Sequence, residues 1–144
     1  RDRGAGVENA RNRLGKIFKL LQPMKSSVVK SFTFEAAHFL PNLKPGHKCG
    51  RVHGHSFRCE VVVTGEVDSI TGFVIDFGDI SAVCRPLHDL LDHRFLNNDV
   101  PGLENPTSEV ICGWIWERLK PALPGLSKVI LHETCTARCE YEGG

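Results

Sequence analysis

Two histidines and one cysteine share a short segment near the middle of the chain. The segment reads Cys49-Gly50-Arg51-Val52-His53-Gly54-His55, and a largely apolar stretch follows it. If a strand begins at His53, alternation places His53 and His55 on the same face, about 6.5–7 Å apart along the strand. Two neutral imidazoles at this separation can bind one metal ion, and Zn²⁺ is the commonest partner of such ligands.

A third histidine ends an earlier strand-like run. Residues 28–39 alternate between two faces, with His38 at the end of the apolar one. The turn-rich link 41–46 would return the chain antiparallel, so that His38 faces His53 and His55. Three histidines would make a zinc site whose fourth position takes water or substrate oxygen, as in catalytic sites. A metal there polarises a carbonyl or lowers the pKa of a bound hydroxyl.

The role of Cys49 has two interpretations. Cys49 lies four residues before His53, across a bend that contains glycine. As a fourth zinc ligand, its thiol would close the site and make it structural. A thiol a few ångströms from the ion would instead have a lowered pKa and could act as base or acid. The neighbours His47, Lys48 and Arg51 add donors for an anion, or form a solvated basic loop.

Two further groups are candidates for chemistry. Asp92-His93 follows a helical pattern, and its carboxylate could orient the imidazole for proton transfer. Glu133 falls in line with the apolar positions Val129 and Leu131 of a last strand, where an unpaired carboxylate is costly. Glu133 is therefore either salt-bridged within the protein or free to bind a cationic or amidine-like ligand.

The apolar pattern predicts the elements that must position these groups. A first strand spans 28–39, a second runs from His53 to about residue 67, and a short third strand is expected at 73–75. Asp76 or Asp79 can cap a helix that ends at 91–93, with a kink or a break at Pro86.

A second helix and a last strand complete the pattern. The run 105–109 predicts a helix with Asn105 as N-cap and Pro106 at the first helical position. The last strand covers 129–134. The predicted fold is α+β, an antiparallel sheet with two helices on one face. Its open edges favour closure by oligomerisation.

Length and composition indicate one soluble domain. The chain has 144 residues with 41% hydrophobic and 24% charged residues. Residues 1–25 carry seven Lys/Arg against two Asp/Glu, so residues 26–144 carry eleven against fifteen, a net charge of −4. We expect a flexible basic leader over 1–25, which the natural product need not include, and a single catalytic domain over 26–144. Nothing indicates nucleic-acid binding, a membrane span or a signal peptide, so a cytoplasmic location is expected.

The cysteines do not indicate a disulfide scaffold. There are six, and the chain lacks the short, loop-rich pattern of secreted disulfide proteins. Cys84 and Cys112 fall in helical patterns and are expected in the core. Cys135 and Cys139 have the wrong spacing for a zinc ribbon and no second pair.

The motifs together resemble the 6-pyruvoyltetrahydropterin synthase superfamily over residues 27–142. They occur in the family's order: Phe34-Glu35-Ala36-Ala37-His38, Cys49-x-x-x-His53-Gly54-His55, Leu91-Asp92-His93, Asn105-Pro106-Thr107-Ser108-Glu109 and Glu133-Thr134. The runs 46–51 and 133–137 look most like the bacterial branch, the 6-carboxy-5,6,7,8-tetrahydropterin synthases of queuosine biosynthesis. The combination is far more specific than any one motif.

The resemblance implies roles for individual residues. His38, His53 and His55 would bind Zn²⁺, and Cys49 would be the catalytic thiol, assisted by Asp92 and His93. Glu133 would bind the pterin ring. The resemblance also places Thr107 and Ser108 near the pterin, although helix capping explains much of the run 105–108, and Glu109 is equally ambiguous.

The resemblance further implies a reaction and an assembly. The expected substrate is 7,8-dihydroneopterin triphosphate, converted by a lyase to 6-carboxytetrahydropterin, acetaldehyde and triphosphate. The expected architecture is the tunnelling fold, in which trimers close a barrel and stack as a hexamer. In that fold two strands follow the helices, so the last strand is expected to break near Thr136 or Ala137.

Two other functions remain open at this point. One is the eukaryote-type synthase, which eliminates triphosphate without cleaving the side chain. The other is a non-catalytic zinc-binding or pterin-binding module. The folate-pathway variant is disfavoured, because it carries glutamate where this chain has Cys49.

Overall fold

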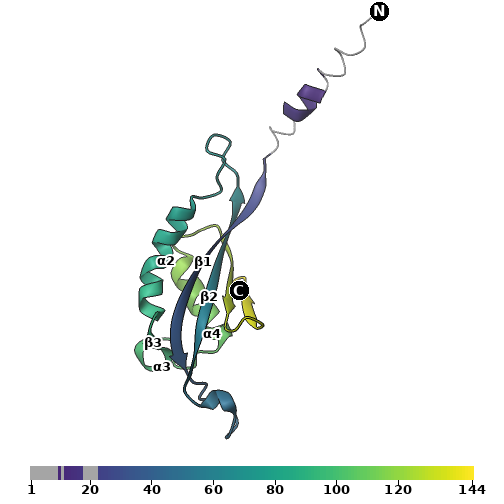
Figure 1. The fold of residues 1–144 in the computed structure, drawn as a ribbon. Coiled ribbons are helices and arrows are strands. Elements are labelled where there is room, and N and C mark those ends of the chain that lie inside the picture. Colours follow the sequence, from purple (N-terminus) through teal and green to yellow (C-terminus); the bar gives the residue numbers. More distant parts are fainter. Residues whose placement is uncertain (1–9, 11, 18–22) are drawn as a thin grey trace, which may run out of the picture.

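A five-stranded sheet forms the centre of the computed structural model, which describes residue 10 and residues 12–17 and 23–144. The strand order is β3-β1-β2-β4-β5 (Figure 1). The strands are β1 (Lys25–His38), β2 (His53–Glu66), β3 (Arg94–Phe95), β4 (Leu126–His132) and β5 (Arg138–Tyr141). Neighbouring strands are antiparallel except β3, which is parallel to β1.

The long pair β1 and β2 sets the register of the histidines. The two strands pair over their full length, from Lys25 opposite Glu66 to His38 opposite His53. Because side chains alternate across a strand, one face of this pair is apolar and the other polar. The predicted antiparallel return of the chain, with His38 facing His53, is confirmed.

The helices cover only the apolar face of the sheet (Figure 1). They are α2 (Phe77–Leu91), the single turn α3 (Leu96–Asp99) and α4 (Ser108–Leu119), with a short 3₁₀ helix η1 (Lys48–Gly50) between β1 and β2. Asp76 caps α2, since its carboxylate accepts from Gly78 N, as predicted. None of the helices in the described residues is long and apolar enough to cross a membrane.

Three predicted details of the sheet are wrong or incomplete. The sheet is mixed, because Arg94 and Phe95 pair in parallel with Ala36 and Ala37. Residues 73–75 form no strand, since Phe73 O accepts from Asp68 N and closes the preceding turn. The last strand is two strands, β4 and β5, separated by residues 133–137, which agrees with the break implied by the resemblance.

The start of α4 and the position of Pro86 show where local rules were overridden. Thr107, not Asn105, is the N-cap of α4, and its hydroxyl accepts from Val110 N at 3.2 Å. Pro106 lies outside the helix, because its carbonyl accepts a hydrogen bond from His38. Pro86 lies inside one continuous helix, so the predicted break is absent. Residues 10 and 12–17 are helical.

The core connects directly to the histidines through Phe57. This side chain is fully buried and stacks on Phe34 with ring centroids 4.9 Å apart. Its ring also meets His38 and His55 edge to face, at 5.7 and 5.3 Å. Packing of the core therefore fixes the histidine rings.

Replacing Phe57 with alanine should lower the free energy of unfolding by about 3–5 kcal/mol, because it leaves a cavity under the histidines. Denaturant unfolding monitored by circular dichroism measures this change. The control is Phe73→Ala, because Phe73 is 54% exposed and its loss should cost less than about 0.5 kcal/mol. Equal losses for the two variants would contradict the packing described above.

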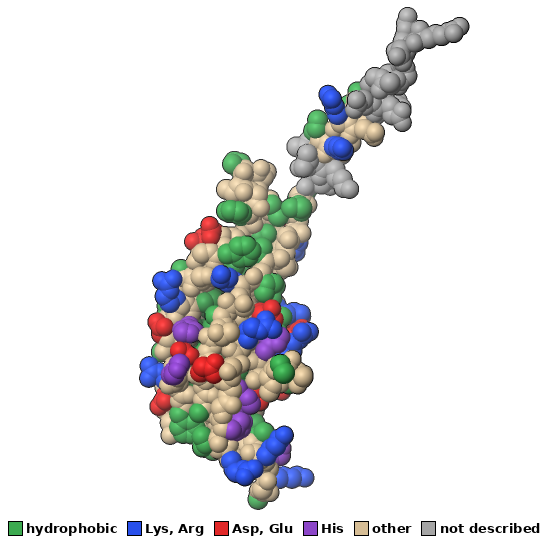
Figure 2. All heavy atoms as spheres, in the orientation of Figure 1, with side chains coloured by type: hydrophobic (Ala, Val, Ile, Leu, Met, Phe, Trp, Pro, Cys, Tyr) green, Lys and Arg blue, Asp and Glu red, His purple; other side chains and the backbone are tan. Residues whose placement is uncertain are grey.

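The polar face of the sheet carries charged side chains (Figure 2). On this face His132 Nε2 contacts Glu60 Oε2 at 2.7 Å, and Arg58 lies 3.3 Å from the same carboxylate. Ser56 donates to Glu35 at 2.7 Å across β1 and β2. A face of this kind tolerates water, which is why the helices leave it open.

Candidate metal centre and active site

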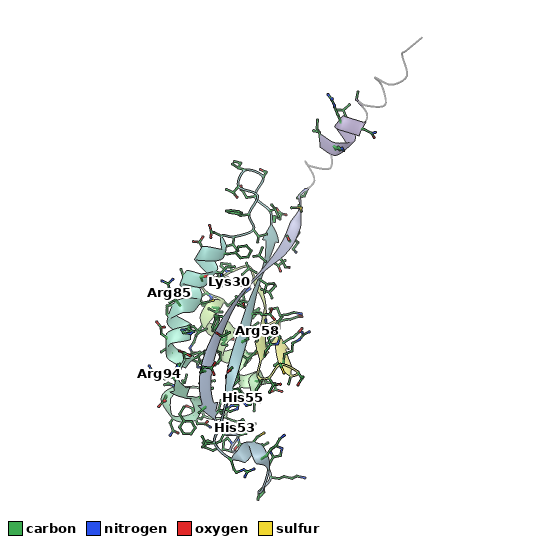
Figure 3. The ribbon with its side chains drawn as sticks, viewed as in Figure 1. Lys30, His53, His55, Arg58, Arg85 and Arg94 are labelled. Atoms are coloured by element: carbon green, nitrogen blue, oxygen red, sulfur yellow. The ribbon has the colours of Figure 1, made fainter. Side chains whose placement is uncertain are left out.

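Three imidazoles and one carboxylate meet at one end of the sheet. Each of the four side chains offers one ligand atom, and these atoms all lie within 4.8 Å of one another: His38, His53, His55 and Glu133. His38 ends β1, His53 and His55 begin β2, and Glu133 follows β4. Figure 3 shows His53 and His55 at the start of β2, with Arg58 further along the same strand.

Backbone carbonyls hold two of the rings in place. His38 Nδ1 donates to Pro106 O at 2.8 Å, and His53 Nδ1 donates to Arg51 O at 2.7 Å. A carbonyl only accepts, so both rings carry their proton on Nδ1 and point an unprotonated Nε2 at each other, 3.1 Å apart. Metal-binding histidines are typically oriented in this way.

The third ring has an unsatisfied nitrogen. His55 Nε2 is buried and has no hydrogen-bond partner among the described residues. It lies 3.3 Å from Glu133 Oε1, close enough for an ion pair but without hydrogen-bond geometry. A buried nitrogen of this kind is costly unless something binds it. The donor set therefore fits a metal ion.

Burial prepares the histidines for metal binding. It lowers the pKa of His38, an effect that outweighs the opposing hydrogen bond to Pro106. It also lowers the pKa of His55, more than the nearby Glu133 carboxylate raises it. Both rings are therefore neutral near pH 7, the state in which imidazole binds metals.

Glu133 is held by the start of α4. Ser108 Oγ, on the first residue of this helix, donates to Glu133 Oε2 at 2.5 Å. The alternation of the last strand correctly places Glu133 on the buried face. That Glu133 lies among the histidines, and that Ser108 contacts it, was not predicted, because both depend on where α4 meets β4. Thr107 caps α4.

Asp92 and His93 form the predicted carboxylate–imidazole pair. His93 Nδ1 lies 2.8 Å from Asp92 Oδ2, and Asp92 Oδ1 accepts from Glu35 N at 2.9 Å. His93 N donates to Glu35 O at 2.6 Å, and its φ of 57° turns the chain from α2 into β3. The hydrogen bonds from Glu35 N and His93 lower the pKa of Asp92. The pair is thus fixed to the edge of β1.

Two cavities flank His55. One, of about 520 Å³, includes Glu35, His55 and His93 in its lining. The other, of about 650 Å³, includes His55 and Glu133 together with Arg58, His132 and Cys135. Arg58 and His132 were not singled out from the sequence, although their alternation with buried neighbours places them on the polar face. His93 and Glu133 thus each share a cavity with His55.

Cys49 lies apart from the ligand atoms. It sits in η1, half-buried, and its backbone N–H donates to His47 Nδ1 at 3.1 Å. Within the described residues, the metal-binding group does not include its thiol. The closed site with three histidines and one cysteine is therefore not the arrangement that the structure shows.

Cys84 and Cys112 behave as structural residues, as predicted. All six positions are described and all are free thiols. Burial raises the pKa of Cys84 to about 11, and burial together with Cys139 raises that of Cys112 to about 12. These two thiols are therefore protonated and unreactive at neutral pH.

Comparison with known proteins identifies the family. The profile of the family described as 6-pyruvoyl tetrahydropterin synthase matches residues 27–144. The chain belongs to this family. It is 46% identical over 120 residues to a 6-carboxy-5,6,7,8-tetrahydropterin synthase of Synechocystis sp., covering 79% of this chain and 91% of that protein. The chain is thus a homologue of a pterin lyase.

Two further relatives show the range of the family. A dihydroneopterin monophosphate aldolase of Pyrococcus furiosus is 38% identical over 102 residues, covering 71% of this chain and 82% of that protein. The structure of the 6-pyruvoyl tetrahydropterin synthase of Caenorhabditis elegans superposes with a TM-score of 0.79 at 28% identity, covering 85% of this chain and 98% of that one. The predicted superfamily is confirmed, and so is its α+β fold.

Proposed function

We propose that the chain is a zinc-dependent lyase that converts 7,8-dihydroneopterin triphosphate to 6-carboxy-5,6,7,8-tetrahydropterin, acetaldehyde and triphosphate in queuosine biosynthesis. The observation that carries the proposal is the 46% sequence identity to a 6-carboxy-5,6,7,8-tetrahydropterin synthase, which covers most of both chains. The cluster of three histidines supports it, because a Lewis acid held there would activate a hydroxyl next to the bond that is cleaved.

His38, His53 and His55 would hold the zinc ion. When bound, the ion would polarise oxygen atoms of the substrate side chain and make the attached hydrogens more acidic. The protein backbone orients the ligands, since Pro106 O fixes the ring of His38 and Arg51 O fixes the ring of His53. Phe57 packs edge to face against the rings of His38 and His55.

Proton transfer falls to Cys49 and to the pair Asp92 and His93. Asp92 holds the His93 ring through Nδ1, so that Nε2 is left for the substrate. His93 is largely exposed, at 79% of its side chain, and shares a cavity with His55. Cys49 would act as a second acid or base on the substrate side chain.

Glu133 is the proposed anchor of the pterin ring. Its carboxylate can accept two hydrogen bonds, from the exocyclic amino group and from a ring N–H. The cavity beside it has room for a bicyclic ring, at about 650 Å³. Ser108 contacts Glu133 directly, and the hydroxyl of Thr107 caps α4 beside it, so both would act near the ring.

The active form is proposed to be a homohexamer of two trimers. In the described residues β3 pairs only with Ala36 and Ala37, so most of that edge of β1 has no neighbouring strand. The polar face of the sheet would line the barrel that three copies close. Light scattering of the purified protein measures this assembly.

The deciding experiment is a product assay. Purified zinc-loaded protein is incubated with 7,8-dihydroneopterin triphosphate, and acetaldehyde is measured together with the mass of the pterin product. Acetaldehyde with a 6-carboxy product supports the proposal. A 6-pyruvoyl product without acetaldehyde would instead support the function named for the family and for the Caenorhabditis elegans protein. The monophosphate is run in parallel, because one relative is named for it.

Replacing Asp92 with asparagine should reduce kcat at least about tenfold, because the amide no longer stabilises a protonated His93. The change preserves size and an oxygen that can accept from Glu35 N. Steady-state kinetics measure the effect. The matched control is Asp89→Asn, since Asp89 is exposed on α2 and, among the described residues, its side chain makes a polar contact only with His88. Equal kcat values for wild type and Asp92→Asn would contradict the proposed role.

A further inference from the structure

The two oxygens of Glu133 lie in two different environments. Oε2 accepts the hydrogen bond from Ser108 Oγ at 2.5 Å. Oε1 faces the histidines and lies 3.3 Å from His55 Nε2. Ser108 therefore fixes the rotation of the carboxylate, with one oxygen directed at the cluster.

The separations within the cluster are those of ligands around one ion. A tetrahedral zinc ion with ligands at about 2.0–2.1 Å separates neighbouring ligand atoms by about 3.3 Å. His38 Nε2 and His53 Nε2 are 3.1 Å apart, and His55 Nε2 and Glu133 Oε1 are 3.3 Å apart. These two pairs match two edges of such a tetrahedron.

An ordinary ion pair does not explain the contact between His55 and Glu133. The chain offers a direct comparison on the polar face, where His132 and Glu60 form a hydrogen bond of 2.7 Å. The exposed fractions of the two glutamates are similar, at 24% for Glu60 and 27% for Glu133. Yet His55 Nε2 has no hydrogen-bond partner in the described residues. The nitrogen and the oxygen are arranged as neighbours around a third atom.

We propose that Glu133 is the fourth ligand of the metal in the substrate-free protein, and that pterin binding withdraws it. The proposal rests on the proposed function, in which Glu133 binds the pterin ring. It adds that the same carboxylate closes the metal site until the ring arrives. No other group in the described cluster is placed to do so.

The exchange follows from the rotation of the carboxylate, because Oε1 cannot face both the metal site and a ring that is bound to both oxygens. The pterin needs both oxygens of Glu133, while the substrate-free protein directs one at Ser108 and one at the metal site. Binding of the ring therefore removes a ligand from the metal and opens a position for side-chain oxygens. By linkage, a pterin without a side chain should weaken metal binding by the same factor by which the metal weakens pterin binding.

The test measures metal binding without substrate. Apo-protein is titrated with Zn²⁺ against a chelator, and with Co²⁺ while the visible spectrum is recorded. Glu133→Ala should weaken Zn²⁺ binding tenfold or more and change the Co²⁺ spectrum. Glu133→Gln keeps the shape and should weaken binding too, since a neutral amide is a poorer ligand. Glu60→Ala is the control and should leave both readouts unchanged.

A second arm uses a pterin that lacks the side chain. Added to the Co²⁺-loaded wild type, it should shift the spectrum towards that of Glu133→Ala, and it should not change the spectrum of that variant. Unchanged Zn²⁺ affinity and Co²⁺ spectrum in both Glu133 variants would overturn the inference. The product assay is independent, because it can fail while Glu133 still proves to be a metal ligand, and it can succeed when Glu133 is not one.

Discussion

Replacing Cys49 with alanine should lower kcat by about 10²–10⁴, the usual contribution of a group that transfers protons in the transition state. The metal content should stay at about one ion per chain, because the Cys49 thiol is not among the clustered ligand atoms. Product assays and elemental analysis of the same preparation measure both quantities. Retained metal with lost turnover would distinguish a catalytic thiol from a structural ligand.

The control for Cys49 is Cys135→Ala. Cys135 is more exposed than Cys49 and lines the cavity beside Glu133, yet no role in proton transfer is proposed for it. Its kcat should remain within a few-fold of wild type. Loss of metal on Cys49→Ala would favour the closed site with a thiolate ligand. Full activity of Cys49→Ala would contradict the catalytic role of Cys49.

Replacing His38 with alanine should remove both the metal and the activity. His38 is completely buried, and two of its contacts are the carbonyl of Pro106 and the ring of His53. Two remaining histidines bind zinc far more weakly than three. The unpaired carbonyl of buried Pro106 should also lower the free energy of unfolding by roughly 1–3 kcal/mol.

Elemental analysis, the product assay and denaturant unfolding test this variant. The control is His47→Ala, which removes an exposed imidazole that lies outside the cluster, and its metal content should equal that of wild type. Metal content near one ion per chain in His38→Ala would show that the cluster does not hold the ion.

The central hairpin could be predicted because local and tertiary preferences agree in it. Alternating residues in β1 and β2 give one apolar and one polar face, and the turn-rich link returns the chain. That agreement also brings His38 opposite His53. The cap at Asp76 follows from a local rule in the same way.

Local rules failed where tertiary contacts decide. Asn105 and Pro106 resemble a helix start, but the carbonyl of Pro106 is used by His38, so α4 begins at Ser108. β3 has only two residues, and its pairing with β1 depends on where α2 ends. No pattern in the sequence of 94–95 predicts it.

The candidate site also combines features that local patterns predict with features that depend on tertiary contacts. The three histidines could be predicted from strand periodicity, and the buried position of Glu133 from the last strand. The contact of Ser108 with Glu133 could not, because it joins the start of α4 to the end of β4, 25 residues apart. The cluster of Arg58, Glu60 and His132 likewise joins β2 to β4.

The central claim is that this chain cleaves a carbon–carbon bond of the substrate side chain. The most direct test quantifies acetaldehyde and triphosphate in one reaction of zinc-loaded wild type with 7,8-dihydroneopterin triphosphate, with Cys49→Ala as the blank. Our proposal requires the two products in equal amounts, and neither above background in the blank. Triphosphate released without acetaldehyde would contradict it.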